Sequence, residues 1–311
     1  MAGHDAALRH AQEHVFLCGL DDAAEQLCHA NMSYGVAKIR HAEQQLGLEP
    51  RGLFIGAPDA TVTRNTMRWR QGFGYGGVVH WNPELAVLDA KPNGCGMLVG
   101  ALDAAPREDR VREAARAARE ARLMLEGLEL DYDLHESNHF VDALALDEVL
   151  VPGAEPPREL FIIHSSGHEH RPASPHGPGL YFDESPELQR LCRTISTPWG
   201  ELHVLQGDEA RRYHDQCARV QRFNLARREL FGRLLFGPSR VVCNLTHQGL
   251  RAPGVFHLGS YWFDRATLDR GPLIPLTLGP DQPVYLLRPR PSFSAGAIET
   301  LGWGERARRL G

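Results

Sequence analysis

The sequence predicts a mixed α+β fold in a single compact domain, and three observations lead to this prediction. Apolar residues make up 42% and charged residues 23% of the 311 residues, which is typical of globular proteins and excludes disordered or fibrous chains. Long helical stretches alternate with short β-like runs, without the regular period of a doubly wound sheet. No internal repeat or linker interrupts the chain. We therefore assign residues 1–311 to one domain, in which helices surround a mixed β-sheet core. Residues 1–50 form a helical N-terminal part, and residues 51–311 form the core that carries the candidate site.

Three stretches carry the apolar spacing of long helices. The first spans about 22–46. The second begins near Pro106, a residue tolerated in a first turn, and its apolar stripe runs from Val111 to Leu128 beside a charged face that we expect to be solvated. The third runs from Asp208 to Leu235 and stops before Gly237.

Short runs rich in β-branched and other apolar residues predict the strands. They are bounded by Gly, Pro, Asn or Asp and lie at 52–55, 85–88, 97–102, 140–146, 160–163, 202–205, 241–242, 255–256 and 283–287. The polar segment 164–179 is predicted to be a long loop of the kind that is often functional or disordered. Its histidines His168, His170 and His176 are expected to be solvated.

Charge and composition exclude several classes of protein. The net charge is −5 with a pI near 6.3, so nucleic acid could be held only by a local basic patch. No apolar run approaches the length of a membrane span. The N-terminal residues lack the positive and apolar regions of a signal peptide, and six scattered cysteines do not form a disulfide framework. We therefore expect a cytoplasmic protein.

Several predicted strands end in a residue that can bind a metal. His164 follows the run 160–163, Cys243 follows 241–242, and His257 follows 255–256. Cys95 lies between two glycines and His139 precedes another strand. A strand that ends in a thiol or imidazole brings that ligand to the rim of its sheet. Each residue taken singly is as well explained as a buried structural residue, so the metal hypothesis depends on the whole set.

Six motifs occur in one order along the chain. They are Lys91-Pro-Asn-Gly-Cys-Gly-Met97, Ser137-Asn-His-Phe-Val-Asp142, His164-Ser-Ser-Gly167, Val242-Cys-Asn244, Gly254-Val-Phe-His-Leu-Gly259 and Pro272-Leu-Ile-Pro-Leu-Thr-Leu-Gly279. In this order they resemble successive motifs of the RtcB family of RNA ligases, and the resemblance extends from about Asp22 to Arg306. It implies an RtcB-like core.

The resemblance also implies roles for individual residues. Cys95 matches the cysteine that bridges two Mn ions in the family, and His139 and His164 match metal-binding histidines. The positions that line the guanine-nucleotide pocket correspond to Asn138, Phe140, Asp142 and Asn244.

Four departures from the family pattern bear on activity. Pro92 replaces a metal-binding Asp, and Cys243 replaces a metal-binding His, with His247 as a nearby substitute. Leu301 stands where the family stores GMP on a histidine, and leucine cannot form that covalent bond. The sequence also ends at Gly311, before the segment that completes the family's nucleotide site.

The sequence thus predicts an RtcB-like metal-dependent enzyme that has lost the covalent GMP step. It would hold Mn²⁺ or Zn²⁺, with Fe²⁺ as a further option, on Cys95, His139, His164 and either Cys243 or His247. Activated water would attack a phosphate ester or related small molecule, with His257 and Asp142 as candidate proton shuttles. Two alternatives stay open: RNA ligation with GTP through another nucleophile such as His257, although the charge does not favour RNA, and a non-catalytic metal- or nucleotide-binding protein. The sequence does not predict an oligomeric state.

Overall fold

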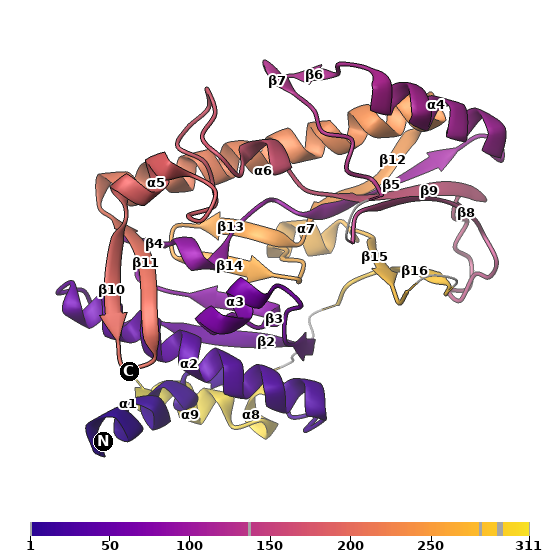
Figure 1. The fold of residues 1–311 in the computed structure, drawn as a ribbon. Helices are drawn as coiled ribbons and strands as arrows, with labels where there is room; N and C mark the ends of the chain where they lie inside the picture. The colour runs from indigo at the N-terminus through magenta and orange to yellow at the C-terminus, as the bar shows by residue number, and fades with distance from the viewer. Residues whose placement is uncertain (1, 136–137, 280–281, 291–294, 311) are drawn as a thin grey trace.

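Two β-sheets form the centre of the fold in the computed structural model, which describes residues 2–135, 138–279, 282–290 and 295–310 (Figure 1). The first sheet has the strand order β1-β2-β3-β14-β13. Its strands are β1 (Val15–Phe16), β2 (Leu53–Thr61), β3 (Tyr75–His80), β14 (Val255–Leu258) and β13 (Gln248–Ala252). Helix α2 (Ala23–Gln45) begins at Asp22, whose carboxylate accepts the Glu25 amide, and contributes Met32, Val36 and Ile39 to the core beneath this sheet.

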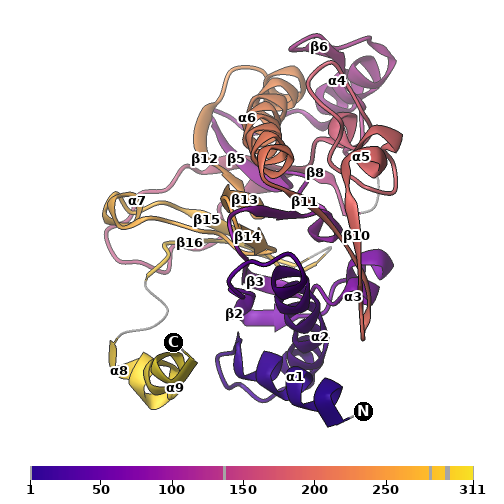
Figure 2. The same ribbon diagram turned by 90° about the vertical axis from the view of Figure 1, so that its left-hand side faces the viewer.

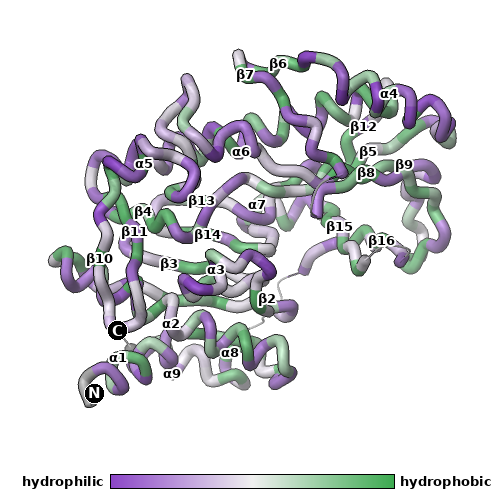
Figure 3. The backbone as a smooth tube through the Cα atoms, in the orientation of Figure 1, coloured by the Kyte–Doolittle hydropathy of each residue, from purple (hydrophilic) through white to green (hydrophobic). Residues whose placement is uncertain are grey.

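The second sheet is antiparallel throughout and carries the candidate site. Its order is β12-β5-β9-β8, formed by β12 (Arg240–Thr246), β5 (Gly96–Leu102), β9 (Glu159–Ser165) and β8 (Phe140–Ala145). One face packs against the long helix α6 (Asp208–Phe236) through Phe161, Phe223 and Phe231. The other face packs against the hairpin of β15 (Ile274–Thr277) and β16 (Val284–Leu287). Hydrophobic segments accordingly gather on the central strands β3, β5 and β9 (Figure 3).

A third sheet and several short elements surround these layers. The sheet has the order β10-β11-β4, from β10 (Arg193–Thr197), β11 (Gly200–Gln206) and β4 (Leu85–Val87). The remaining elements are α1 (Ala2–Glu13), α3 (Thr66–Gln71), η1 (Leu88–Ala90), α4 (Glu108–Glu120), the hairpin β6 (Met124–Leu125) and β7 (Leu128–Glu129), η2 (His168–His170), α5 (Pro186–Leu191), α7 (Arg265–Asp269), α8 (Ala295–Thr300) and α9 (Trp303–Leu310). No helix in the described part of the chain is long and apolar enough to cross a membrane.

The C-terminal helices lie against the N-terminal segment (Figures 1 and 2). Arg306 donates hydrogen bonds to the carbonyls of Gln12 and Val15, and Trp303 donates to the carbonyl of Leu17. A guanidinium at these carbonyls closes the C-terminal end of α1, because the last carbonyls of a helix have no partner within it.

The α+β prediction is confirmed, and so are the first and third long helices. The second helix was predicted too long: α4 ends at Glu120, and Leu125 and Leu128 face each other across a hairpin. The two residues between them, Glu126 and Gly127, have φ of 49° and 80°, which is the backbone of a two-residue hairpin turn and cannot continue a helix.

Candidate metal centre

Four predicted ligands lie at one end of the second sheet. Cys95 directly precedes β5 and His139 directly precedes β8, whereas His164 lies near the end of β9 and His247 follows the end of β12. Because neighbouring strands run antiparallel, the starts of β5 and β8 meet the ends of β9 and β12. Across the sheet the residues follow the order His247, Cys95, His164, His139. Of the three residues that the strand-end pattern singled out, His164 belongs to this set, whereas Cys243 and His257 do not.

Three of the four side chains converge at the spacing of ligands to one ion. The ligand atoms of Cys95, His164 and His247 all lie within 4.8 Å of one another. His164 Nε2 is 3.1 Å from Cys95 Sγ and 3.2 Å from His247 Nε2. Around a tetrahedral ion with metal–nitrogen distances of about 2.0 Å and a metal–sulfur distance of about 2.3 Å, neighbouring donors lie about 3.3–3.6 Å apart. The residues thus fit a divalent ion.

His139 extends the cluster on the far side of the thiol. Its Nε2 lies 3.9 Å from Cys95 Sγ, and it does not belong to the three-residue group. Cys95 therefore stands between His139 on one side and His164 and His247 on the other. A thiolate in this position can contact one ion on the side of His139 and another on the side of His164 and His247.

Hydrogen bonds fix which imidazole nitrogens are free to bind. His164 Nδ1 donates to the Asn138 carbonyl at 2.6 Å, and His139 Nδ1 donates to Asp133 Oδ2 at 2.7 Å. Each bond places the proton on Nδ1 and directs the Nε2 lone pair toward Cys95. The rings are preset for Nε2 coordination.

The electrostatics of the cluster favour a thiolate. Burial raises the pKa of the Cys95 thiol, but the imidazoles of His164 and His247 and the hydrogen bonds from His139 and His164 lower it well below its ordinary value. Burial lowers the pKa of His139, and Asp133 together with Cys95 raises it to about 9. Burial also lowers the pKa of His247. Protons and a cation compete for these atoms, so metal binding releases protons.

The turn before Cys95 has a backbone that explains its sequence. Asn93 Oδ1 accepts the Cys95 amide at 3.0 Å, and the Asn93 carbonyl accepts Asn224 Nδ2 at 2.7 Å. Gly94 has a φ of 65° and a Cβ there would lie 2.3 Å from Asn224 Nδ2. Only glycine fits such an approach without displacing its neighbour. Asn93 and Gly94 therefore hold the thiol at the start of β5.

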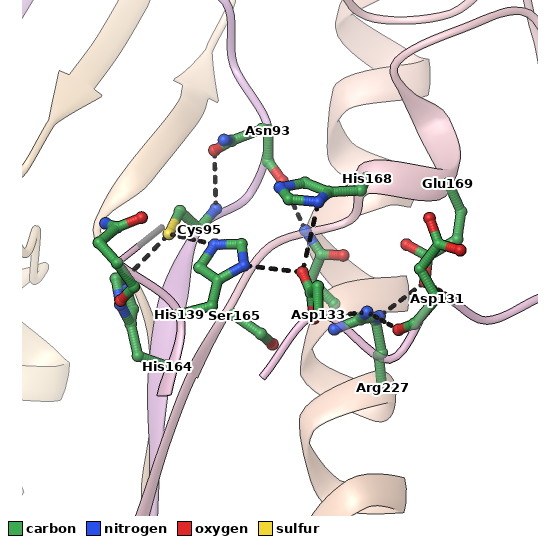
Figure 4. A network of polar contacts seen from close by, with 12 residues as sticks. Asn93, Cys95, Asp131, Asp133, His139, His164, Ser165, His168, Glu169 and Arg227 are labelled. Carbon is green, nitrogen blue, oxygen red and sulfur yellow. Dashed lines mark hydrogen bonds and ion pairs between the residues drawn. The ribbon is translucent and has the colours of Figure 1, made fainter. Parts of the chain in front are cut away.

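A second group of potential ligands, Asp133, His139 and His168, lies behind His139 (Figure 4). Asp133 Oδ2 is 2.7 Å from His139 Nδ1 and 3.4 Å from His168 Nδ1, while its Oδ1 accepts Arg227 Nη2 at 2.9 Å. Arg227 in turn donates to Glu169 Oε1 at 2.8 Å.

This second group is better explained as a hydrogen-bonded support than as a metal site. The 2.7 Å separation of Asp133 and His139 is a hydrogen-bond distance and is shorter than the roughly 3.3 Å expected between two ligands of one ion. A cation would also lie beside the Arg227 guanidinium, which already neutralises the carboxylate. Asp133 thus orients His139, as carboxylates commonly orient metal-binding histidines.

Replacing Asp133 by asparagine should lower metal affinity by about tenfold to a hundredfold, because a neutral amide oxygen accepts the His139 Nδ1 proton more weakly than a carboxylate does. Competition with a chromogenic chelator measures this affinity. The isosteric change Asp183→Asn, at a half-exposed carboxylate outside the cluster, is the matched control and should leave it unchanged. Equal affinity in wild type and Asp133→Asn would remove Asp133 from the support of the site.

The structure places Cys243 apart from the ligands that converge. Its side chain packs with Val99, Leu160 and Ile162 in a small apolar cluster, and burial raises the pKa of its thiol to about 11. Cys243 pairs with Val99 of β5. It lies within β12 rather than at its end, because the strand continues to Thr246, four residues beyond the predicted end. Of the two options left by the sequence, His247 joins the cluster and Cys243 does not.

The two candidate proton shuttles lie in different environments. His257 is buried on β14, its Nδ1 donates to the Ser260 carbonyl at 2.8 Å, and burial lowers its pKa to about 4. Asp142 is exposed on β8, and burial of part of its carboxyl group raises its pKa. Among the described residues it makes no hydrogen bond or ion pair with the metal cluster.

The residues matched to a nucleotide pocket mostly form hydrogen bonds or ring contacts within the protein. Asn138 offers its carbonyl to His164, and its side chain is exposed. Phe140 is half-buried, with its ring 5.5 Å from that of His164. Both ends of the Asn244 amide are engaged, since Oδ1 accepts Arg228 Nε and Nδ2 donates to the Leu225 carbonyl. Ser137 of the same motif lies outside the described residues.

Several residues of the site were not predicted. Asp133, Glu169 and Arg227 were missed, because nothing in their local sequence separates them from surface charges. The expectation that His168 and His170 are solvated was wrong: His170 is fully buried against Phe223, and His168 is largely buried beside Asp133. A proline-rich loop packed on α6 excludes water from them.

We compared the chain with models of protein families and with curated proteins. No protein-family model matches the chain, and no curated protein is detectably similar to it.

Proposed function

We propose that this chain is a divalent-metal-dependent enzyme, distantly RtcB-like, that hydrolyses a phosphate ester or a related small anionic substrate without a covalent nucleotide. The observation that carries the proposal is the cluster of Cys95, His164 and His247, three donors at the spacing of one ion. Catalytic sites typically provide three protein ligands, whereas structural sites provide four. A divalent ion held there would supply Lewis acidity toward a substrate oxygen and would activate water.

A buried arginine next to the ligands favours an anionic substrate. Arg228 is fully buried, and its guanidinium bonds to chain positions that neighbour the ligands: Nη1 lies 3.4 Å from the Gly94 carbonyl and 3.3 Å from the Ser165 carbonyl, and Nε donates to Asn244 at 2.9 Å. Gly94 precedes Cys95 and Ser165 follows His164. The guanidinium therefore lies directly behind the cluster.

The charge of this arginine is not balanced by a carboxylate. Arg228 forms no ion pair with any described residue, and its Nη2 has no hydrogen-bond partner. The buried hydroxyl of Tyr261, whose ring lies 5.8 Å from that of His247, also has no partner. A divalent ion, one thiolate and this guanidinium leave positive charge in excess, and buried charge needs compensation. A small oxyanion that accepts hydrogen bonds from Arg228 and Tyr261 would supply it.

The placement of Leu301 supports hydrolysis rather than ligation, whereas the low pKa of His257 limits that residue as a proton shuttle. Leu301 packs near Gly19, where a Cβ would lie 3.4 Å from its side chain, and α9 docks on the N-terminal segment. The position matched to the covalent histidine is thus aliphatic and held against another part of the fold. His257, with a pKa of about 4, is neutral at pH 7 and can accept a hydrogen bond, but it is a weak general base there.

The burial of the cluster favours a second candidate function, a non-catalytic metal-binding protein. Cys95, His164 and His247 are 4%, 4% and 7% exposed. Should His139 move to share the ion, the ion would have four protein ligands and no position for water, as in structural sites.

Metal-dependent phosphoesterase assays test the proposal. Protein loaded separately with Mn²⁺, Zn²⁺ and Fe²⁺ should hydrolyse p-nitrophenyl phosphate or bis(p-nitrophenyl) phosphate in proportion to bound metal, and His247→Ala should not. Incubation with labelled GTP should give no acid-labile adduct. Full metal occupancy without turnover would favour the non-catalytic protein, and an adduct would favour ligation.

Arg228→Met should weaken oxyanion binding by about tenfold or more, because a charge-assisted hydrogen bond and its Coulomb attraction are lost. The change in the visible spectrum of the Co²⁺-loaded protein on adding inorganic phosphate measures this binding. Arg219→Met, on the same helix, is the control and should bind phosphate like wild type. Tyr261→Phe, which removes only the unpartnered hydroxyl, should weaken binding less. Unchanged phosphate binding in both Arg228→Met and Tyr261→Phe would contradict the assigned oxyanion contacts.

A further inference from the structure

A small cavity with mostly apolar walls lies beside the third sheet, outside the candidate metal cluster. It has a volume of about 90 Å³ and is enclosed by α3, η1, the segment around 182–183 and β11. Met67, Leu88 and Phe182 form apolar walls, and Asp89, Lys91 and His203 provide polar groups. Ligand sites usually combine apolar walls with a few converging polar groups, and this cavity has room for only a few non-hydrogen atoms.

One wall of the cavity is a fixed carboxylate–imidazole pair. Asp89 Oδ2 accepts the His203 backbone amide at 2.7 Å, and Oδ1 accepts His203 Nδ1 at 3.0 Å. The Phe182 ring stacks on the imidazole with centroids 3.9 Å apart. Burial lowers the pKa of His203, but the hydrogen bond to Asp89 and the charge of that carboxylate outweigh it and raise the pKa above the ordinary value. His203 Nε2 has no protein partner among the described residues, and in the imidazolium form it can donate to a ligand.

Lys91 provides a second donor on a rigid backbone. Its φ is 50°, an unusual conformation for a residue with a side chain, and its carbonyl accepts Arg68 Nη2 at 2.7 Å and Gln248 Nε2 at 3.1 Å. Its Nζ lies 2.6 Å from Asp183 Oδ2, at a carboxylate that is 36% exposed. An ammonium has three hydrogens, so Lys91 can bind a further acceptor.

A further lysine, Lys38, lies near Asp89 but does not line the cavity. Lys38 is only 2% exposed, and its Nζ donates to Gln71 Oε1 at 2.7 Å and to the Glu201 carbonyl at 3.4 Å. Within the described chain it forms no ion pair with a carboxylate. Lys38 and Lys91 thus place two ammonium groups beside or in the cavity, near the carboxylates of Asp89 and Asp183. A buried ammonium without a carboxylate partner is stabilised by a nearby anion.

We propose that this cavity binds a small monoanionic carboxylate with a short apolar tail, of the size of acetate or propionate. The carboxylate accepts hydrogen bonds from His203 Nε2 and Lys91 Nζ, and the tail contacts Met67, Leu88 and Phe182. The apolar walls and the small volume favour a small monoanionic carboxylate over a phosphate dianion. The site shares no ligand residue with the metal cluster, so it can be tested independently of the proposed hydrolysis.

Calorimetric titration of the metal-loaded protein with propionate tests the proposal. Propionamide has the same shape without the charge and should bind at least tenfold more weakly. Hexanoate should also bind at least tenfold more weakly, because its chain exceeds the cavity. Equal affinity for propionate and propionamide, or no binding of either acetate or propionate, would overturn the proposal.

Two surface-accessible substitutions keep the test independent of folding. Asp183→Asn removes the carboxylate that competes for Lys91 and should tighten propionate binding by about threefold or more. Met67→Trp places a larger side chain at the 41% exposed Met67 and should abolish binding, whereas Met124→Trp, at a 50% exposed methionine elsewhere, should not. Propionate binding that none of these substitutions alters would place the ligand outside this cavity.

Discussion

Cys95→Ala is expected to abolish metal binding, with the largest effect of any single substitution in the cluster. Cys95 is the one residue that lies between His139 and the pair His164 and His247. Without the thiolate, the remaining imidazoles lose both the negative charge and the central ligand. Elemental analysis should therefore find metal in the purified wild type and almost none in the variant.

The same variant should also unfold at a lower temperature. A ligand that binds only the folded state stabilises it by about 2.7 kcal/mol when its concentration is a hundred times Kd, and this corresponds to a shift on the order of 5 °C for a chain of this size. The chelator EDTA should lower the melting temperature of the wild type by a similar amount and leave Cys95→Ala unaffected.

Cys243→Ala is the matched control, since it removes another buried thiol of the same sheet. Cys243 packs among apolar side chains, so this change should cost about 1–2 kcal/mol of stability and leave the metal content unchanged. If Cys95→Ala kept its metal, or if Cys243→Ala lost it, the assignment of the ligand set would be wrong.

The sequence predicted the ligands that occupy strand ends. A buried run followed directly by a metal-capable residue identified His164, and the flanking glycines identified Cys95. In an antiparallel sheet such ends meet, so residues 69 positions apart come within 3.1 Å. This part of the site is encoded locally, by where each strand starts or stops.

The choice between Cys243 and His247 could not be made in this way, because it depends on where β12 ends. The apolar run stops at Val242, but the strand continues to Thr246, with a shift of register between Val241 and Cys243. Pairing with β5 maintains the strand beyond its apolar residues. Only the paired structure shows that His247, and not Cys243, stands at the end.

The sequence also could not predict that Asp133, Glu169 and Arg227 lie behind His139, because their contacts depend on the folded structure. Asp133 lies in an irregular segment, Glu169 lies in the single turn η2, and Arg227 is on a helix with many charged residues. Charged residues are rarely fully buried unless they are paired, and pairing over 94 positions leaves no local signal. The hydrophobic pattern of α6 predicted a helix, but it could not predict that Arg227 faces inward.

Arg227→Met is expected to be the most destabilising substitution in the molecule outside the apolar core. Arg227 is fully buried and bonds to Asp133, to Glu169 and to the carbonyl of Asp131. Its removal leaves the buried carboxylate of Glu169 without a counter-charge and leaves Asp133 with His139 alone. Breaking a buried pair in this way costs about 3–5 kcal/mol, and urea unfolding at pH 7 should show a loss of this size.

The loss should depend on pH in a defined direction. In the wild type, burial raises the pKa of Asp133 but His139 and Arg227 lower it to about 2, so its contribution is complete above about pH 4 and is lost as the pH falls toward 2. Burial already raises the pKa of Glu169 in the wild type, and the loss of Arg227 should raise it further. The pKa of Asp133 should also rise, although the hydrogen bond from His139 remains. As the pH falls from 7 to 4, the stability of the variant should therefore rise relative to that of the wild type. Protonated carboxyl groups are neutral, so their burial requires no cation to compensate a charge.

The control for this experiment is Arg233→Met on the same helix. Arg233 is exposed and lies 3.9 Å from Glu229, so its loss should change stability by no more than about 0.5 kcal/mol at any pH. If Arg227→Met does not fold at pH 7, Glu169→Gln removes one of the two charges and should show a smaller cost with no metal lost. A pH-independent cost in Arg227→Met would show that packing, rather than charge, is what the guanidinium contributes. The support for His139 would then be steric, and metal affinity should follow the volume of residue 227 rather than its charge.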